Sequence, residues 1–243
     1  IRWYSLAYIM GILLGWLYCK KKLIKDRYIL NLFDDFITYL IIGIILGGRF
    51  GYVLFYNFEF FLKNPVEILM VWNGGMSFHG GLIGVAIAAM IFSKKNKINQ
   101  FILFDLVSLS APIGIFFGRI ANFINSELYG IPSNAFWSVK FILVDNINRH
   151  PSQLYEAFFE GIILLLLLRY FLKKGYLNIP GKISALFLIF YSVFRFVTEF
   201  FRVPDQHLGY LIFNLSMGQI ISLIFILFGI ILFYFKNENK QIN

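Results

Sequence analysis

Seven long apolar segments make up most of this sequence, and they constrain its fold more than any other feature. They cover residues 3–19, 34–56, 77–93, 101–125, 153–172, 182–202 and 215–235. Each is at or near the length that a helix needs to cross a bilayer, about 20 residues. The pattern predicts an all-α polytopic membrane protein with seven transmembrane helices, organised as a single integral-membrane domain over residues 1–243.

Composition agrees with this class and excludes others. Hydrophobic residues make up 59% of the 243 residues and charged residues only 14%, which is too apolar for a soluble domain of this size. The single cysteine, Cys19, excludes an internal disulfide and a cysteine-rich metal site. The sequence opens at Ile1 and close to an apolar segment, so we expect further residues upstream.

The net charge of +9 could indicate a nucleic-acid partner, but the positions of the cations indicate membrane topology instead. Cations cluster after the first, third, fifth and seventh segments, as Lys20, Lys21, Lys22, Lys25, Arg27, Lys94, Lys95, Lys97, Lys173, Lys174, Lys182, Lys236 and Lys240. The other connections carry few, chiefly Lys63, Lys140 and Arg149. The positive-inside rule therefore predicts an external N-terminus and a cytoplasmic C-terminus, and we expect no nucleic-acid partner.

Two connections on the predicted outer side have features of their own. Residues 127–151 lack a spanning pattern, and the alternation over 136–141 with a turn-like Asp145-Asn146 predicts some strand structure in a small external cap between helices 4 and 5. Residues 58–73 are apolar with scattered charge, which favours a segment lying along the outer interface.

Ionisable and amide side chains interrupt the apolar segments at one depth. They are Tyr4, Arg49, His79, Arg119, Asn122, Asn125, Glu127, Glu156, Glu160, Arg195 and Glu199. With a rise of about 1.5 Å per residue, the charged members of this set fall in the outer part of the membrane. An ionisable group in hydrocarbon needs a cavity or a partner, so we expect them to converge on one cavity that opens toward the outer leaflet. Asp105 lies near the inner face and is expected to serve helix packing.

The residue types indicate a phosphate ligand. Arginines stay charged and donate in bidentate fashion, which suits a phospholipid head group. Arg119 and Asn122 share a helical face, as do Arg195 and Glu199, which can pair. His79, in a glycine-rich turn, could act as a general base, while the glycines allow close helix approach.

The same residues could have structural roles instead of functional ones. Arg119 could pair with Glu127 to fix a helix end. Arg195 and Glu199 could form an intrahelical pair at an interface, and His79 could be structural. The role of Arg49 is open between the two readings.

Five motifs carry a family resemblance. They are RWYSLAY at 2–8, HGGLIG at 79–84, GRIANFINSELYG at 118–130, RHPSQLYEA at 149–157 and RFVTEFFRVPD at 195–205. In this order they closely resemble the prolipoprotein diacylglyceryl transferases, which are seven-helix enzymes of the bacterial inner membrane.

The resemblance implies a reaction in which the diacylglyceryl group of phosphatidylglycerol moves to the lipobox cysteine thiol of a prolipoprotein signal peptide, with release of glycerol phosphate. It implies no metal and no organic cofactor, and an active site toward the outer leaflet, among membrane lipids. By motif, the expected catalytic residues are His79, Arg119 and Arg195, and the expected substrate-binding residues are Arg119, Asn122, Glu127, Tyr4, Tyr191 and Glu199.

A transporter of an anionic lipid or solute is the alternative, because transporters also carry intramembrane arginines and glycines. Three features favour the transferase. The number of segments is odd, no internal repeat is visible, and the polar groups lie to one side of the membrane midplane. Other lipid head-group enzymes usually need an aspartate-rich metal motif or a phosphate-accepting histidine, and neither spacing occurs here.

Overall fold

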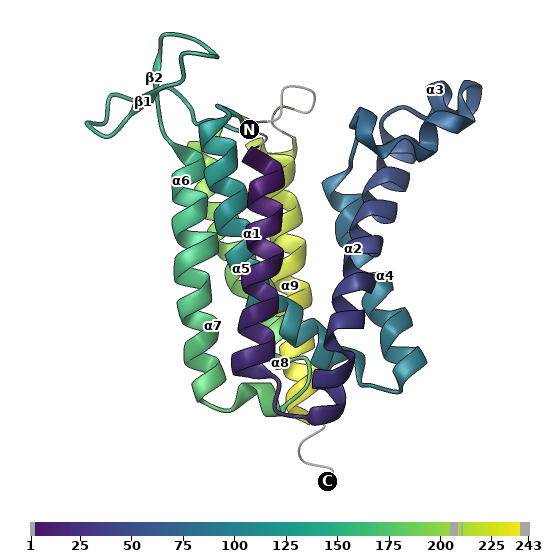
Figure 1. Ribbon diagram of the computed structural model, residues 1–243. Helices are drawn as coiled ribbons and strands as arrows, with labels where there is room; N and C mark the ends of the chain where they lie inside the picture. The colour runs from purple at the N-terminus through teal and green to yellow at the C-terminus, as the bar shows by residue number, and fades with distance from the viewer. Residues whose placement is uncertain (1–2, 205–208, 210, 239–243) are drawn as a thin grey trace. The chain divides into compact units, whose positions relative to one another are not determined.

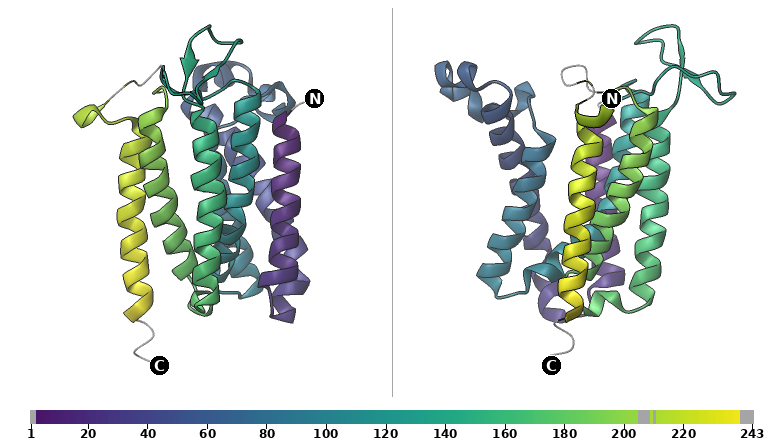
Figure 2. Two further views of the ribbon diagram at one scale, coloured as in Figure 1. Left: turned by 90° about the vertical axis from the view of Figure 1, so that its left-hand side faces the viewer. Right: turned by 180° about the vertical axis from the view of Figure 1, so that it is seen from behind.

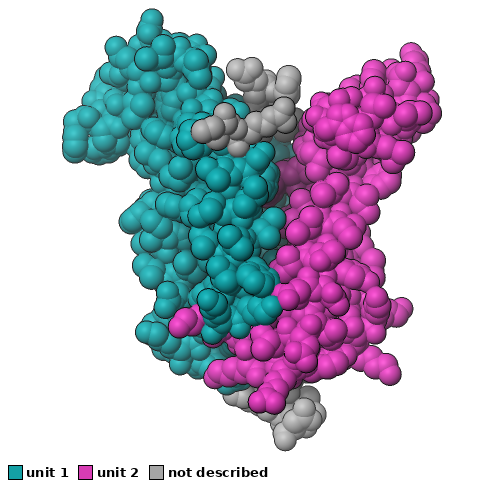
Figure 3. Space-filling model, viewed as in Figure 1, with its two compact units in different colours: residues 1–21, 105–243 teal, residues 22–104 magenta. Residues whose placement is uncertain are grey.

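The computed structural model describes residues 3–204, 209 and 211–238. Arg2, Asp205 and Lys240, which belong to the motifs and charge pattern above, lie outside the described residues. The chain divides into two compact units, distinguished in Figure 3. Unit 1 comprises Ile1–Lys21 and Asp105–Asn243, and unit 2 comprises Lys22–Phe104. Each unit is described by itself.

Unit 1 is a bundle of helices that run alongside one another (Figures 1 and 2). Its helices are α1 (Trp3–Tyr18), most of α5 (Gln100–Ile124), α6 (Ser152–Glu156), α7 (Leu164–Lys173), α8 (Lys182–Thr198) and α9 (Met217–Glu238). A π-helical stretch, Ala157–Ile163, joins α6 to α7. Shorter helical turns cover Tyr176–Asn178, Glu199–Phe201 and Ile212–Asn214, and the turn Cys19–Leu23 spans the boundary with unit 2.

Hydrogen bonds of the backbone bring several ends of these helices together. Isolated β-bridges join Gly130 to Arg202 and Pro132 to Arg149. The segment after α5 is thereby tied to the start of α6 and to the end of α8. A side chain at Gly130 would collide with the carbonyl oxygens of His150 and Phe201, so this close approach requires glycine. The polar residues near these ends are therefore gathered at one end of unit 1.

A two-stranded antiparallel sheet lies in the connection between α5 and α6 (Figure 1). Strands β1 (Val139–Lys140) and β2 (Asn148–Arg149) pair Val139 with Arg149 and Lys140 with Asn148. The strand structure predicted in residues 127–151 is thus confirmed, although each strand has only two residues. The placement of this connection as an external cap stays a prediction.

Asp105 has a packing role in unit 1, as the sequence predicts. The residue is fully buried, and its carboxylate accepts hydrogen bonds from the backbone N–H groups of Gly181 and Ser184, at 2.8 and 2.7 Å. The Ser184 hydroxyl donates a third, at 2.5 Å. These are N–H groups that the first turn of α8 leaves without a partner inside the helix, so Asp105 fastens α5 to the start of α8.

Unit 2 pairs two long helices, α2 (Arg27–Phe55) and α4 (Phe78–Asn96). Between them lie α3 (Phe58–Lys63) and two 3-10 turns, Pro65–Leu69 and Val71–Asn73. The two helices meet through glycines. A side chain at Gly43 or Gly47 of α2 would collide with the backbone of Gly84, and one at Gly51 would collide with Gly80. The glycines of the 79–84 motif therefore serve close helix approach, as predicted.

Arg49 is a structural residue of unit 2. It is 5% exposed, and its guanidinium donates to five backbone carbonyl oxygens of the α2–α4 connection. Those oxygens belong to Glu67, Ile68, Met70, Gly74 and Gly75. The guanidinium also lies 5.0 Å from the ring centroid of Phe61. These contacts favour the structural reading of Arg49, because they occupy its donors in holding the connection against α2.

Four helices of the described chain are long and apolar enough to cross a membrane. They are Arg27–Phe55, Gln100–Ile124, Lys182–Phe201 and Met217–Lys236. The other three expected spans are shorter or interrupted. Helix α1 has 16 residues, and α4 has 19 residues and ends in Lys94, Lys95 and Asn96. The fifth expected segment, residues 153–172, is divided by the π-helical stretch. The mostly helical architecture is consistent with an all-α membrane protein, whereas seven crossings and their orientation stay predictions.

Candidate active site

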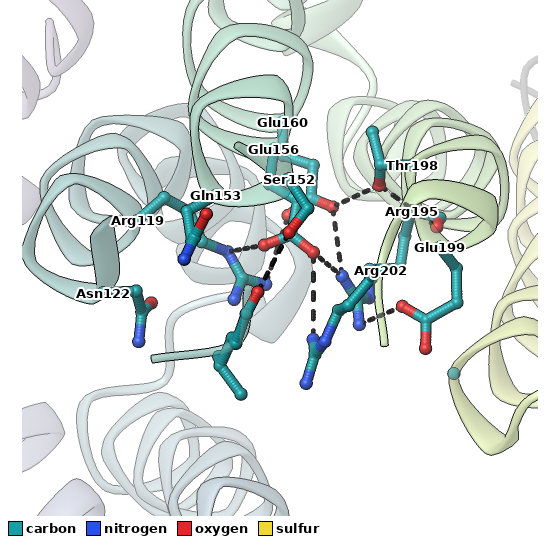
Figure 4. Close-up of polar contacts among 12 residues, drawn as sticks. Arg119, Asn122, Ser152, Gln153, Glu156, Glu160, Arg195, Thr198, Glu199 and Arg202 are labelled. Carbon is teal, nitrogen blue, oxygen red and sulfur yellow. Dashed lines mark hydrogen bonds and ion pairs between the residues drawn. The ribbon is translucent and has the colours of Figure 1, made fainter. Parts of the chain in front are cut away.

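The polar centre of unit 1 begins with Arg119, near the end of α5 (Figure 4). Its Nε lies 3.1 Å from Oε2 of Glu156, and its Nη2 lies 3.4 Å from Oε2 of Glu160. Both carboxylates are fully buried, whereas the arginine side chain is 17% exposed. The pairing of Arg119 with Glu127 that the sequence left open is not observed, because Arg119 faces the two glutamates near the start of the α6–α7 helix instead.

Arg195, on α8, reaches the same two carboxylates from the other side. It forms an ion pair with Glu156, and its Nη1 lies 3.9 Å from Oε1 of Glu160. Its Nη2 lies 2.5 Å from Oε2 of Glu199, one turn along the chain, so the predicted i,i+4 pair is confirmed. Arg202 adds a third guanidinium, whose Nη1 lies 3.8 Å from Oε1 of Glu156.

Helix geometry explains why the two buried glutamates act together. Glu156 closes α6 and Glu160 lies four residues later in the π-helical stretch, so both project from one face of the same helical column. Single π-helical turns recur at functional sites, because the extra residue re-aims the side chains around them. The Thr198 hydroxyl adds a long hydrogen bond to Oε1 of Glu160, at 3.4 Å.

The three arginines and three glutamates form a charge-balanced cluster, which we call the Arg–Glu cluster: Arg119, Arg195, Arg202, Glu156, Glu160 and Glu199. Burying a charge is costly unless it is paired, and here each carboxylate has at least one guanidinium partner. Within the described residues, Nη1 of Arg119 has no hydrogen-bond or ion-pair partner. The cluster therefore retains a partly exposed donor for an anion.

A second polar group joins α1 to the end of α5. The Tyr4 hydroxyl donates to the carboxylate of Glu127 and accepts a hydrogen bond from Nδ2 of Asn122, at 2.6 Å. Asn122 is 8% exposed, while Glu127 is exposed. The structure thus brings together three of the predicted substrate-binding residues, and we call them the Tyr4–Asn122–Glu127 group.

The backbone holds Glu127 in a strained turn. Its neighbours Ser126 and Leu128 have positive φ angles, 58° and 55°, which L-residues seldom adopt. The start of α6 clamps this turn, because Nε2 of Gln153 donates to the Glu127 carbonyl at 2.7 Å and the Ser152 hydroxyl donates to the Leu128 carbonyl at 3.0 Å. Strain of this kind is common at functional sites.

Of the two remaining predicted residues, Tyr191 lies beside the Arg–Glu cluster and interacts electrostatically with Glu160, Arg119 and Arg195, whereas His79 belongs to unit 2. Tyr191 lies one turn before Arg195 on α8, and its ring stacks on Phe187 with centroids 5.5 Å apart. His79 is in unit 2, in the first turn of α4, after the Ser77 side chain that caps this helix. Its imidazole is exposed and meets the Phe78 ring edge-on. The catalytic role of His79 stays a prediction.

The sequence missed the roles of Glu156, Glu160 and Arg202 in this cluster. The depth argument had placed both glutamates in the outer membrane region, but it paired neither with an arginine. Their spacing of four residues in an apolar segment was the available signal. Within the described residues, no group of three histidine, cysteine, aspartate or glutamate side chains is arranged to hold a metal ion.

The comparison with known proteins adds the family. The family model of prolipoprotein diacylglyceryl transferase matches residues 1–235. The chain belongs to this family. A Rickettsia bellii (strain OSU 85-389) protein named phosphatidylglycerol–prolipoprotein diacylglyceryl transferase is 50% identical over 245 residues, covering 100% of this chain and 93% of the relative. The resemblance drawn from the five motifs is thereby confirmed.

Proteins of the same name from two other bacteria are nearly as similar. A protein of that name from Rhodopseudomonas palustris is 48% identical over 240 residues, covering 95% of this chain and 84% of the relative. Another, from Azospirillum brasilense, is 48% identical over 235 residues, covering 95% of this chain and 88% of the relative. Family membership and the four candidate spans together indicate a membrane protein.

Proposed function

We propose that this chain is a transferase that moves the diacylglyceryl group of phosphatidylglycerol to a prolipoprotein. The family match over residues 1–235 and the relatives' shared name support the reaction. The observation that supports the site is the Arg–Glu cluster, in which the Arg119 side chain is partly exposed and its Nη1 is not paired with either glutamate. A phosphate ester needs such a donor.

In the proposed step, the lipobox cysteine Sγ forms a bond to the glyceryl carbon while the bond from that carbon to the phosphate oxygen breaks. The electron pair of the broken bond leaves with glycerol phosphate, and the thiol proton passes to a base. An unperturbed thiol has a pKa of about 8.5, so a base or a positive field must favour the thiolate. His79 is the proposed base.

Arg119 is proposed to bind the lipid phosphate through its Nη1, which the two glutamates leave open. Arg195 is proposed to stabilise the charge that develops on the leaving phosphate, as preorganised donors do in other transfer reactions. Because Arg195 is held by Glu156 and Glu199, its guanidinium need not reorganise during the step.

The Tyr4–Asn122–Glu127 group is proposed to bind the glycerol hydroxyls of the head group. Glu127 is exposed and accepts hydrogen bonds, and the Asn122 amide is both donor and acceptor. Tyr191 and Glu199 are proposed to line the same site from α8. The proposed setting is the outer leaflet of the bacterial inner membrane, with a prolipoprotein signal peptide and membrane lipids as partners.

Mass spectrometry of a synthetic lipobox peptide, incubated with the purified protein in phosphatidylglycerol vesicles, tests this function. We expect a mass gain of one diacylglyceryl group on the cysteine, with release of glycerol phosphate. A peptide with serine in place of the cysteine is the matched control and should gain nothing. No gain on the cysteine peptide from folded protein would refute the proposal.

A further inference from the structure

We propose that Glu160 is a positioning residue that makes the site prefer a singly charged phosphodiester over a doubly charged phosphomonoester. The inference rests on the proposed function, because it assumes that the ligand of Arg119 is a phosphate ester. It concerns a residue that cannot touch the substrate itself, since Glu160 is fully buried. Glu160 acts through the guanidinium groups that it faces.

The contacts of the two buried glutamates differ. Glu156 contacts all three arginines of the cluster, from two sides. Among the described residues, Glu160 pairs with two of these arginines, Arg119 and Arg195, at 3.4 and 3.9 Å, and it accepts one long hydrogen bond from Thr198. Glu156 therefore ties the helices together, whereas the negative charge of Glu160 is less fully offset by its neighbours.

That charge lies directly behind the proposed anion position. Nη2 of Arg119 faces Glu160, and the open Nη1 is bonded to the same guanidinium carbon. An anion at Nη1 is thus attracted by Arg119 and repelled by the glutamate on the far side of the group. Attraction and repulsion both grow in proportion to the charge on the anion, whereas the cost of removing the anion from water rises more steeply with charge. Because Glu160 offsets part of the attraction by Arg119, this cost favours the singly charged ester.

Substrate and product differ in charge, so this repulsion affects them differently. The phosphate of a phosphodiester lipid carries one negative charge, while a phosphomonoester carries about −1.5 to −2 near neutral pH. Breaking the bond to the diacylglyceryl group converts the first kind into the second. A site with no excess positive charge therefore holds the substrate and releases the product.

Calorimetric binding to the purified wild-type protein at pH 8 tests the preference directly. The probes are sn-glycerol 1-phosphate and its methyl ester, which differ by one methyl group and about one charge. We expect the methyl ester to bind more tightly than the more highly charged monoester. Equal or tighter binding of the monoester would overturn the proposal without any substitution.

A pair of variants separates charge from packing. In Glu160→Gln the shape is kept and the charge is lost, and we expect the affinity ratio to shift toward the monoester by about tenfold. In Glu160→Asp the charge is kept, and the ratio should stay near that of the wild type. Glu59→Gln, which removes an exposed carboxylate of unit 2, is the control and should also leave it unchanged. An unshifted ratio in Glu160→Gln would overturn the proposal.

The binding and transfer assays can refute the role of Glu160 and the transferase function separately. Wild-type protein that modifies the lipobox peptide but shows no charge preference would refute only the role of Glu160. Protein that shows the preference but never modifies the peptide would refute the transferase function and leave a site selective for phosphodiesters. Product inhibition of peptide modification by glycerol phosphate links the binding assay to the transfer assay. We expect this inhibition to strengthen about tenfold in Glu160→Gln.

Discussion

Nε of Arg119 lies 3.1 Å from Oε2 of Glu156, and this single buried carboxylate also pairs with Arg195. One side chain on α6 thus connects α5 and α8 (Figure 4). A substitution that removes one member leaves the remaining buried charges less fully compensated, which is more costly than the loss of an exposed pair. Substitutions in the cluster must therefore be tested for folding and for activity separately.

Arg119→Lys should separate positive charge from guanidinium geometry. A lysine can pair with Glu156 or Glu160, but it has no planar fork with a further donor for phosphate. We expect the rate of peptide modification to fall by about tenfold to a hundredfold, as for the loss of one charge-assisted hydrogen bond. Arg149→Lys is the matched control, because Arg149 pairs with Asp145 in the connection that carries β1 and β2. A fully active Arg119→Lys would contradict the proposed phosphate contact.

Tyr4→Phe should damage the Tyr4–Asn122–Glu127 group while leaving its ring in place. The hydroxyl both donates to Glu127 and accepts from Asn122, so its loss leaves the largely buried Asn122 amide without this partner. We expect the Michaelis constant for phosphatidylglycerol to rise about tenfold, because an unmade hydrogen bond costs about 1–3 kcal/mol, and the melting temperature to fall by a few degrees. Tyr8→Phe, on the same helix and more exposed, is the control. An unchanged Michaelis constant would remove Tyr4 from lipid binding.

His79→Gln should lower the rate of transfer with little loss of lipid binding. Glutamine keeps a hydrogen-bonding side chain but cannot accept a proton near neutral pH, and general-base groups typically contribute about 100-fold to 10,000-fold. Raising the pH toward the thiol pKa should restore part of the activity, since the thiolate then forms without a base. A loss confined to lipid affinity would instead make His79 a binding residue.

Arg49→Met should destabilise the α2–α4 connection. The substitution keeps an apolar stem but leaves five backbone carbonyl oxygens without their donor. We expect a loss of at least about 2 kcal/mol of folding free energy, and faster proteolysis within residues 64–76. Arg169→Met, on α7, is a matched arginine substitution outside unit 2. Equal proteolysis rates in wild type and Arg49→Met would contradict the structural role.

The Asp145–Arg149 pair should make the β1–β2 connection sensitive to acid. Hydrogen bonds from the Arg149 side chain and the Ile147 N–H lower the pKa of Asp145 below its usual value. A lowered folded-state pKa stabilises the fold fully above the unfolded pKa of about 3.9 and loses that contribution as the pH falls through the lowered value. We expect the protection of amides in residues 139–149 against exchange to fall below pH 4 relative to that of α9, which serves as an internal reference.

Asp145→Asn should remove this acid dependence. The amide oxygen can still accept a hydrogen bond from Arg149, but it carries no charge at any pH. We expect the protection of these amides at pH 7, relative to that of α9, to resemble that of the wild type in acid, and to change little on acidification. A variant with the same pH response as the wild type would show that another group controls this connection.

Local patterns made much of this protein predictable. Apolar segments of spanning length, the five motifs and the i,i+4 spacing of Arg195 and Glu199 are all short-range features, and they yielded the membrane class, the family and one ion pair of the site. The glycines of the 79–84 motif likewise predicted close helix approach. Each of these properties depends on residues within one helix or one motif, so a linear reading can recover it.

The polar partnerships depended on the tertiary structure. Arg119 and Glu160 are 41 positions apart in the chain, and Tyr4 and Glu127 are 123 apart. Depth along the helices placed these residues at one level, but it could not say which faces meet, because the rotation of each helix is set by packing and by the backbone bonds near Gly130. The sequence alone therefore determined what kind of protein this is, whereas the folded helices decided that each arginine of the Arg–Glu cluster is held by a glutamate and that Nη1 of Arg119 stays open.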